Sequence, residues 1–540
     1  MWLLLACSDP PASEALPPPD LEAHCREAIG EPRVEQVNDR IWVAIGFDLA
    51  NTVVVETAEG RVVVDVGMSP ARAAAAKAAL DEVSEGPVVA LVYTHSHIDH
   101  IGGASVWVEE GTEIWATESF SEHFFKQYGV FLPAERDRGA RQFAQSIGTE
   151  ALPCSALGAR PDIEAALSMG VVMPTHTFSG EAQVHGLRLV EAHGETHDQL
   201  YVVADEVLMP GDNWYRAFPN LYTIRGTSPR PVEDWIASLD AMRAEAPAVL
   251  VPSHTAPVTE DVEGRLRDYR DGIQFVRDAV VRGANAGVPV DDLAELELPP
   301  HLAARPELAE LYGQVDWSVR AIYSNELGWF DGRTEALYPL PPEELRARTV
   351  ASMGGPEAVL AEARSTDDPR WALHLYALVE APPVEVAGRY EELAETVPNS
   401  NGRGWLLQSA AELRGEAVLP ERPTLSEDFV EAIPIEHIFT SMSSRLRADE
   451  ALDVHESLRF DLQGEVWTIT VRRGVAEVVH GEPLPGTPEP VATLSCSPST
   501  WRRIALQLQS PAGAIADGEL ALEGSTVDLV GFLARFDRGF

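Results

Sequence analysis

The chain has 540 residues, 45% of them hydrophobic, so it can bury substantial cores and is long enough for about three domains of ordinary size. Its 85 acidic and 41 basic side chains give a formal net charge of -44, and the acidic residues are spread along the sequence. This charge repels nucleic acid and anionic membranes, so we expect no nucleic-acid partner. An anionic substrate would need a site with its own positive potential, made by metal ions and arginines.

The first residues resemble the end of a bacterial lipoprotein signal. Leu4-Leu5-Ala6-Cys7 is similar to the motif at which such signals are cut and lipidated, and the Pro-rich segment from Pro10 to Pro19 suits a tether. Only six residues precede Cys7 and none is basic, so either the true start lies upstream or the match is accidental. We expect a signal-like segment and linker over residues 1–30, with a lipid anchor at Cys7 as one alternative. The protein would then be bacterial and either periplasmic, attached to the cell envelope or secreted.

The three remaining cysteines, Cys25, Cys154 and Cys496, lack the CxxC spacing of metal and redox motifs, so we expect structural thiols. A disulfide between Cys25 and Cys154 is compatible with the sequence but cannot be inferred from it. No stretch after the first residues is apolar over the length that a membrane-spanning helix needs.

Residues 31–260 have the pattern of a domain with two sheets and helices outside them. The Ala-rich stretch 71–83 predicts a helix, and residues 119–148 are of mixed helical character. Short runs rich in Val, Ile and Leu predict strands at 41–45, 52–55, 61–67, 88–93, 113–116, 187–192, 200–203, 207–209 and 248–251.

Side chains that bind metals follow several of these strands. Thr94-His95-Ser96-His97-Ile98-Asp99-His100 places three imidazoles and a carboxylate directly after one strand. Further candidates follow three other strands, in His193-Gly194-Glu195-Thr196-His197, Gly211-Asp212 and Ser253-His254. Histidine and aspartate are common zinc ligands, and rigid strands hold ligands within the narrow tolerance of metal bonds. The pattern predicts a metal site with enough ligands for two ions.

From about residue 261 to 418 the pattern becomes helical, without clustered metal ligands. Helices are expected at 264–281, 306–311, 342–353, 356–364, 371–379, 384–396 and 405–414. A Pro-rich linker at 420–423 precedes a small α+β region over 424–540. Its expected elements are helices at 428–446 and 498–509 and strands at 458–463, 466–472, 475–479 and 491–495.

The motif from Thr94 to His100, together with Gly211-Asp212 and His254, resembles the metallo-β-lactamase superfamily. The resemblance implies an α/β protein whose catalytic domain, over residues 31–260, has the αββα fold.

A longer string narrows the resemblance. Phe218-Pro219-Asn220-Leu221-Tyr222-Thr223-Ile224-Arg225-Gly226-Thr227, with Gly194-Glu195-Thr196 before it and Leu327-Gly328-Trp329-Phe330-Asp331-Gly332 after it, is similar to the alkyl sulfatase family of that superfamily. This similarity implies that residues 261–418 form an all-α dimerisation domain and residues 424–540 a sterol-carrier-protein-like domain. It also implies a homodimer.

The family resemblance implies two Zn²⁺ per chain and a role for each candidate ligand. The ligands of one ion would be His95, His97 and Glu195, those of the other Asp99, His100 and His254, and Asp212 would bridge the two ions. Asp99 and Asp212 are also expected to take part in catalysis. Most members of the superfamily have a histidine where Glu195 stands, so His193 or His197 remains an alternative ligand.

Asn220 and Arg225 fall where the alkyl sulfatase family holds the sulfate group. A planar guanidinium binds two sulfate oxygens at once, and an amide adds a further donor. The alternative for Arg225 is a surface ion pair in a very acidic protein. Phe143 and Ile147 stand where some relatives carry a tyrosine, and the histidines that some carry shortly before Asn220 are absent, so the general acid is not identified.

The expected function is hydrolysis of a small amphiphilic alkyl sulfate ester to an alcohol and inorganic sulfate by a binuclear zinc centre. Two alternatives remain. The same fold could hydrolyse another ester, a thioester, a lactone or a β-lactam, although Arg225 would have no sulfate to bind in those substrates. The third interpretation is a non-catalytic lipid-binding protein.

Overall fold

The computed structural model describes residues 18–161, 169–417 and 427–537. Contacts between residues divide the chain into two compact units, residues 1–123 with 134–423, and residues 124–133 with 424–540. Cys7 and the expected linker at 420–423 lie outside the described residues, so the predictions made for them stay predictions. Within the described ranges, no helix combines the length and the apolarity needed to cross a membrane.

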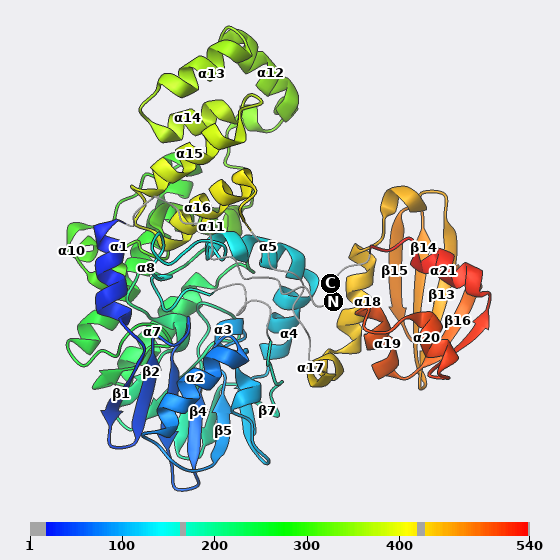
Figure 1. The fold of residues 1–540 in the computed structure, drawn as a ribbon, viewed down its shortest axis with the longest axis horizontal. Helices are drawn as coiled ribbons and strands as arrows, with labels where there is room; N and C mark the ends of the chain where they lie inside the picture. The colour runs from blue at the N-terminus through cyan, green and yellow to red at the C-terminus, as the bar shows by residue number, and fades with distance from the viewer. Residues whose placement is uncertain (1–17, 162–168, 418–426, 538–540) are drawn as a thin grey trace, which may run out of the picture. The chain divides into compact units, whose positions relative to one another are not determined.

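The larger unit contains two β-sheets (Figure 1). The first has seven strands in chain order, antiparallel from β1 to β4 and parallel from β4 to β7. They are β1 Arg33–Asn38, β2 Ile41–Ile45, β3 Thr52–Glu56, β4 Arg61–Val64, β5 Val88–Val92, β6 Glu113–Thr117 and β7 His176–Phe178. The second has the order β12-β11-β10-β9-β8. Its strands are β8 Glu181–Val184, β9 Leu187–Glu191, β10 Leu200–Ala204, β11 Val207–Met209 and β12 Val249–Leu250.

The two sheets share one apolar core, because alternate residues of their strands point to the same side. Val53 and Val55 of β3 belong to the same buried cluster as Leu200 and Val202 of β10. Tyr201, between those two, belongs instead to a second cluster with helices α7 (Val232–Ala244) and α8 (Val262–Asn285). Helix α2 (Pro70–Asp81) packs against β1 and β2 of the first sheet. The αββα fold expected for this region is confirmed.

The helical part of the larger unit follows α8, and proline begins most of its helices. Proline at the first helical position has no donor to lose and has the helical φ already. The helices are α9 Val290–Leu293, α10 Pro300–Ala303, α11 Val315–Leu327, α12 Pro342–Ser352, α13 Pro356–Ser365, α14 Pro369–Tyr376, α15 Pro383–Ala394 and α16 Ser400–Arg414. The helix expected at 306–311 is wrong, because only the 3-10 turn Pro306–Leu308 forms. Neither α7 nor α11 was predicted.

Helix α16 is anchored to the part of the unit that contains the two sheets. The fully buried Arg403 donates through Nε to the carbonyl of Ala151 at 2.9 Å, and Leu407 packs in a cluster with Leu152. Cys25 and Cys154 form a disulfide in the same region, so the two thiols are structural as expected. This bond connects the short N-terminal helix α1 (Pro19–His24) to the segment that α16 covers.

The smaller unit is an antiparallel sheet with one parallel pair, in the order β15-β14-β13-β16-β17. Its strands are β13 His455–Leu462, β14 Glu465–Arg472, β15 Val475–His480, β16 Pro490–Cys496 and β17 Leu520–Gly524. Its helices are α17 Glu427–Ala432, α18 Ile435–Ser444, α19 Pro498–Ala505, α20 Pro511–Ala516 and α21 Thr526–Leu533. The single helix expected at 428–446 is wrong, because two separate helices form in its place. The first ends before Pro434 and the second begins after it, since proline cannot continue a helix. Phe439 stacks on Trp467 at the centre of this α+β fold.

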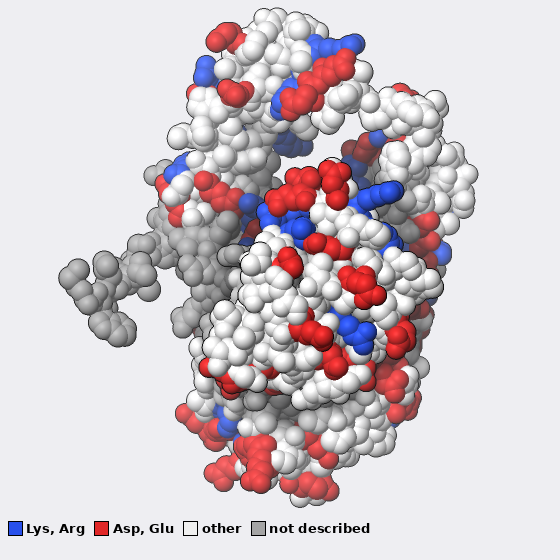
Figure 2. Space-filling model, turned by 90° about the vertical axis from the view of Figure 1, so that its right-hand side faces the viewer, with Lys and Arg blue, Asp and Glu red and all other residues white. Residues whose placement is uncertain are grey.

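The surface charge follows the composition. Figure 2 shows acidic side chains spread over the face that it draws, with basic side chains among them. Many arginines form ion pairs with neighbouring carboxylates, as Arg243 does with Glu263 at 2.7 Å. Such exposed pairs contribute little to stability.

Replacing both Cys25 and Cys154 by serine should lower the free energy of unfolding by about 2–5 kcal/mol, because the crosslink spans a long loop and restricts the unfolded chain. Thermal and denaturant unfolding of the two proteins would measure the difference. A reductant should destabilise the natural protein and leave the double variant unchanged, and equal stability of the two proteins under oxidising conditions would contradict the prediction.

Candidate active site

The predicted ligands come from four loops, each of which follows a strand. His95, His97 and their neighbours follow β5, and Glu195 lies between β9 and β10. Asp212 lies in the 3-10 turn Gly211–Asn213 after β11, and His254 follows β12. The core that joins the two sheets therefore brings together side chains separated by more than a hundred residues.

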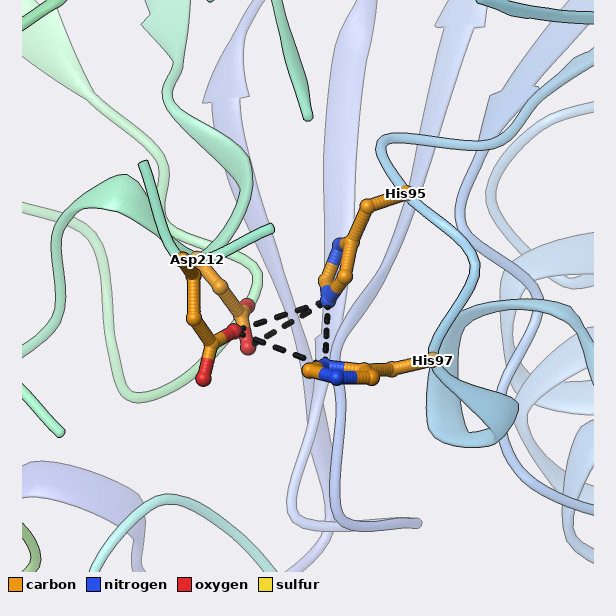
Figure 3. Close-up of side chains that lie close together, drawn as sticks. His95, His97 and Asp212 are labelled. Carbon is orange, nitrogen blue, oxygen red and sulfur yellow. Dashed lines mark hydrogen bonds and ion pairs between the residues drawn. The ribbon is translucent and has the colours of Figure 1, made fainter. Parts of the chain in front are cut away.

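Four of these side chains form the first ligand group, His95, His97, Glu195 and Asp212, which are all buried and offer ligand atoms within 4.8 Å of one another. His95 Nε2 lies 2.8 Å from His97 Nδ1. Glu195 Oε2 lies 3.5 Å from the first of these nitrogens and 3.6 Å from the second. Figure 3 shows the two imidazoles facing the carboxylate of Asp212.

The second ligand group contains Asp99, His100 and His254. Asp99 Oδ2 lies 3.4 Å from His100 Nε2 and 3.6 Å from His254 Nε2. Asp212 lies between the groups: its Oδ2 is 3.1 Å from His254 Nε2 and 3.8 Å from His95 Nε2, and its Oδ1 is 3.5 Å from His100 Nε2. This is the position that a bridging carboxylate would need.

The ligand atoms that the two groups offer suit divalent cations. His100 Nε2, Glu195 Oε2 and Asp212 Oδ1 are buried and have no hydrogen-bond partner among the described residues. Buried polar atoms are rarely left without a partner. Burial and the neighbouring imidazoles of His100 and His97 lower the pKa of His95 well below its usual value. Its ring is therefore neutral at ordinary pH, which is the form that binds metal.

Asp65, directly after β4, orients the histidines from outside. It accepts hydrogen bonds from Thr94 N and Thr94 Oγ1 (both 2.9 Å), from Ser253 Oγ (2.8 Å) and from His100 Nδ1 (2.8 Å). Because the Thr94 hydroxyl donates to Asp65, its oxygen can accept from His95 Nδ1 at 3.1 Å. These contacts turn Nε2 of both imidazoles towards the ligand groups, a role that outer carboxylates often have around metals.

Glu195, rather than a neighbouring histidine, points into the first group. Asn213 holds its loop: the Asn213 Oδ1 accepts from Glu195 N at 3.0 Å, and Nδ2 donates to the carbonyl of Ala192 at 2.8 Å. His193 instead lies 3.1 Å from Glu191, and the ring of His197 stacks on His123. Sequence reasoning left these three residues as alternatives because the direction of the loop depends on Asn213.

Arg225 lies beside the first group, where it is 9% exposed. Its Nη2 is 3.4 Å from His97 Nε2, and its Nη1 donates to Glu135 at 2.6 Å. The ion pair considered in the sequence analysis therefore exists, but it is buried at the edge of the ligand groups.

Helix α5 (Leu132–Gln142) holds the Arg225 segment, a function that the sequence analysis missed. Besides Glu135, Arg138 donates to the carbonyl of Arg225 at 2.6 Å. Gln142 Oε1 accepts from Arg225 N and from Thr223 Oγ1, both at 2.9 Å. Residues 135, 138 and 142 have the spacing of one face of a helix. Polar side chains at this spacing in the sequence are the pattern from which their shared role could have been predicted.

Asn220 is buried five residues earlier. Its backbone N–H donates to the hydroxyl of Tyr215 at 2.7 Å, and its Oδ1 is buried without a partner among the described residues. Phe143 and Ile147, which stand where some relatives have a tyrosine, pack in an apolar cluster with Tyr215.

Three family models match the chain: the metallo-beta-lactamase superfamily over residues 45–254, alkyl sulfatase dimerisation over 290–416 and alkyl sulfatase C-terminal over 423–540. A linear primary-alkylsulfatase of Pseudomonas sp. (strain ATCC 19151) is 34% identical over 465 residues, which cover 79% of this chain and 88% of the relative. An (R)-specific secondary-alkylsulfatase of Pseudomonas sp. is 28% identical over 542 residues, which cover 93% of this chain and 80% of the relative. The structure of the stereoselective inverting sec-alkylsulfatase Pisa1 from Pseudomonas sp. aligns with a TM-score of 0.88 at 26% identity, over 99% of this chain and 88% of that one.

The fold and the buried cluster of histidines and carboxylates define a hydrolase of the metallo-β-lactamase superfamily. Within that class, the chain belongs to the alkyl sulfatase family, and it is an enzyme. The resemblance seen in the sequence is confirmed.

Changing Asp65 to asparagine should weaken metal binding by about 10- to 100-fold, because the amide cannot accept all four of the hydrogen bonds that orient the ligand loops. Metal content measured after dialysis against graded concentrations of a chelator would give the affinity. Asp205→Asn is the matched control, because Asp205 also has a positive φ (55°) but pairs with Arg40 at the surface. Equal metal affinity of the Asp65 variant and this control would contradict the orienting role.

Proposed function

We propose that the protein is a binuclear zinc hydrolase that cleaves alkyl sulfate esters to an alcohol and inorganic sulfate. The observation that carries the proposal is the position of Arg225, whose guanidinium lies 3.4 Å from a histidine of the first ligand group. A cation at the edge of a metal site suits a substrate with an anionic head group. The names of the relatives, linear primary-alkylsulfatase and secondary-alkylsulfatase, support the same substrate class.

Each residue has a proposed role. One zinc would be held by His95, His97 and Glu195, the other by Asp99, His100 and His254, with Asp212 between them. Bound zinc would supply Lewis acidity and would acidify water at ordinary pH. Arg225 and Asn220 would orient the sulfate, while α5 keeps the arginine in place through Glu135 and Gln142. Because these groups are buried, the site excludes bulk water and strengthens each electrostatic contact.

We also propose a homodimer and an extracytoplasmic location. The alkyl sulfatase dimerisation model matches the helical region, where Trp329 and Tyr338 are 75% and 93% exposed. Large apolar side chains that reach solvent in this way are typical of interfaces. The disulfide between Cys25 and Cys154 suits an oxidising compartment, and lipidation at Cys7 remains one route to the cell envelope. Light scattering and cell fractionation would test the two proposals.

Zinc-loaded protein should contain about two zinc ions per chain and release sulfate from dodecyl sulfate and from a secondary octyl sulfate, because the proposed ligands form two groups that can each hold an ion. A chelator should abolish the release, zinc should restore it, and His95→Ala should remain inactive. A parallel panel of carboxylic esters, thioesters, lactones and β-lactams tests the other hydrolase reactions. Sulfate release at background, with turnover of one of these, would reject the sulfatase proposal. A protein that binds lipid but turns over no substrate would instead favour the non-catalytic alternative.

Arg225→Lys should raise the KM for an alkyl sulfate by about 10-fold or more, because lysine keeps the charge but loses the planar pair of donors. The metal content should stay unchanged, since Arg225 is not a proposed ligand. Arg136→Lys is a matched control on α5, where Arg136 pairs with its neighbour Asp137. If both variants have the KM of the natural protein, Arg225 does not bind the sulfate.

A further inference from the structure

Arg230 is a buried arginine behind the first ligand group. It lies between the Arg225 segment and helix α7, and its side chain is 2% exposed. Its Nη1 donates to Glu195 Oε1 at 2.5 Å, and the Glu195 side chain is itself only 4% exposed. Burying such a pair costs desolvation of both charges, which is recovered only when the geometry is good.

The two carboxylate oxygens of Glu195 have different surroundings. Oε1 is taken by Arg230, whereas Oε2 is buried without a hydrogen bond from the described residues. Oε2 is the oxygen that lies 3.5 Å from His95 Nε2 and 3.6 Å from His97 Nδ1. A carboxylate can otherwise turn about its last bond and offer both oxygens to a cation. The contact with Arg230 fixes this rotation, so only Oε2 of Glu195 faces the first ligand group.

Arg230 also offsets the negative charge that Glu195 brings to the first ligand group. A neutral histidine in the place of Glu195 would bring no such charge. Glu195 shares the first group with the carboxylate of Asp212, and Asp99 lies in the neighbouring group. Carboxylates crowded in a buried site repel one another. The guanidinium of Arg230, whose Nη1 lies 2.5 Å from Glu195 Oε1, places a positive charge beside Glu195.

We propose that Arg230 is a positioning residue that fixes Glu195 as a one-oxygen ligand and offsets its charge, so that the group of His95, His97, Glu195 and Asp212 retains its metal ion. This inference rests on the proposed metal centre. It assigns Arg230 to Glu195 through Nη1, whereas Nε and Nη2 of Arg230 are buried without a hydrogen-bond partner among the described residues.

The test compares Arg230→Gln and Arg230→Lys with the natural protein by zinc competition against a chelator and by the absorption spectrum of cobalt-substituted protein. Arg230→Gln should weaken binding of one of the two ions by about 10- to 100-fold and alter the cobalt spectrum, as loss of an outer partner does at other metal sites. Arg230→Lys keeps the charge and should recover part of the affinity. The KM of remetallated Arg230→Gln for dodecyl sulfate should change less than its metal affinity.

Arg61→Gln is the matched control. Arg61 is also a nearly buried arginine (side chain 5% exposed), and it pairs with Asp81 at 2.6 Å, on α2. Its loss should lower stability and leave metal affinity and the cobalt spectrum unchanged. If Arg230→Gln does not fold, the comparison of Arg230→Lys with Arg61→Lys decides the question by the same two measurements.

Three results would overturn the inference. One is unchanged metal affinity in the Arg230 variants. Another is a lysine variant no better than the glutamine variant, which rejects the charge offset. The third is a KM that rises more than the metal affinity falls, which would make Arg230 a substrate contact. Failure of the proposed function is separate: the natural protein would bind its metals and hydrolyse no sulfate ester, while the affinity comparison at Arg230 could still be made.

Discussion

The ligand groups depend on the buried carboxylate of Asp65. This side chain accepts from the loop after β5 through Thr94, from His100 directly, and from the loop after β12 through Ser253. It can do so because its backbone has a φ of 57°, a conformation that aspartate tolerates better than most residues. One carboxylate thus joins the ligand loop after β5, in the first sheet, to the ligand loop after β12, in the second. Directly and through Thr94, it fixes the ring orientations of His100 and His95.

The end of the site at Arg225 is built differently. Strand ends hold the ligand groups, whereas Arg225 lies in a loop that α5 positions through Glu135, Arg138 and Gln142. Metal ligands must meet within narrow distances, which strands of a shared core provide. The proposed contact with a sulfate does not require the fixed bond lengths of a metal ligand, so a loop held by one helix suffices.

The sequence predicted the parts of the site that local patterns determine. His95, His97, Asp99 and His100 follow a strand within one short motif, and short runs rich in Val, Ile and Leu predicted most strands of the two sheets. The contacts of Arg230 with Glu195 and of Glu135 with Arg225 could not be predicted, because they span 35 and 90 residues. Their partners are ordinary charged residues in an acidic chain. Helix α11 was missed although its buried residues Val315, Val319, Ile322 and Tyr323 have helical spacing in the sequence.

The loop that carries His254 also constrains how the enzyme folds. His254 Nδ1 donates to the carbonyl of Leu49, and the Asn51 side chain donates to the carbonyls of Pro252 and Thr255, contacts that span 201 to 205 residues. During synthesis these contacts therefore cannot form until the chain beyond residue 255 has left the ribosome. Native contacts between such distant residues form slowly, because a long loop must close first. The candidate metal centre, which includes His254, therefore cannot be complete before then.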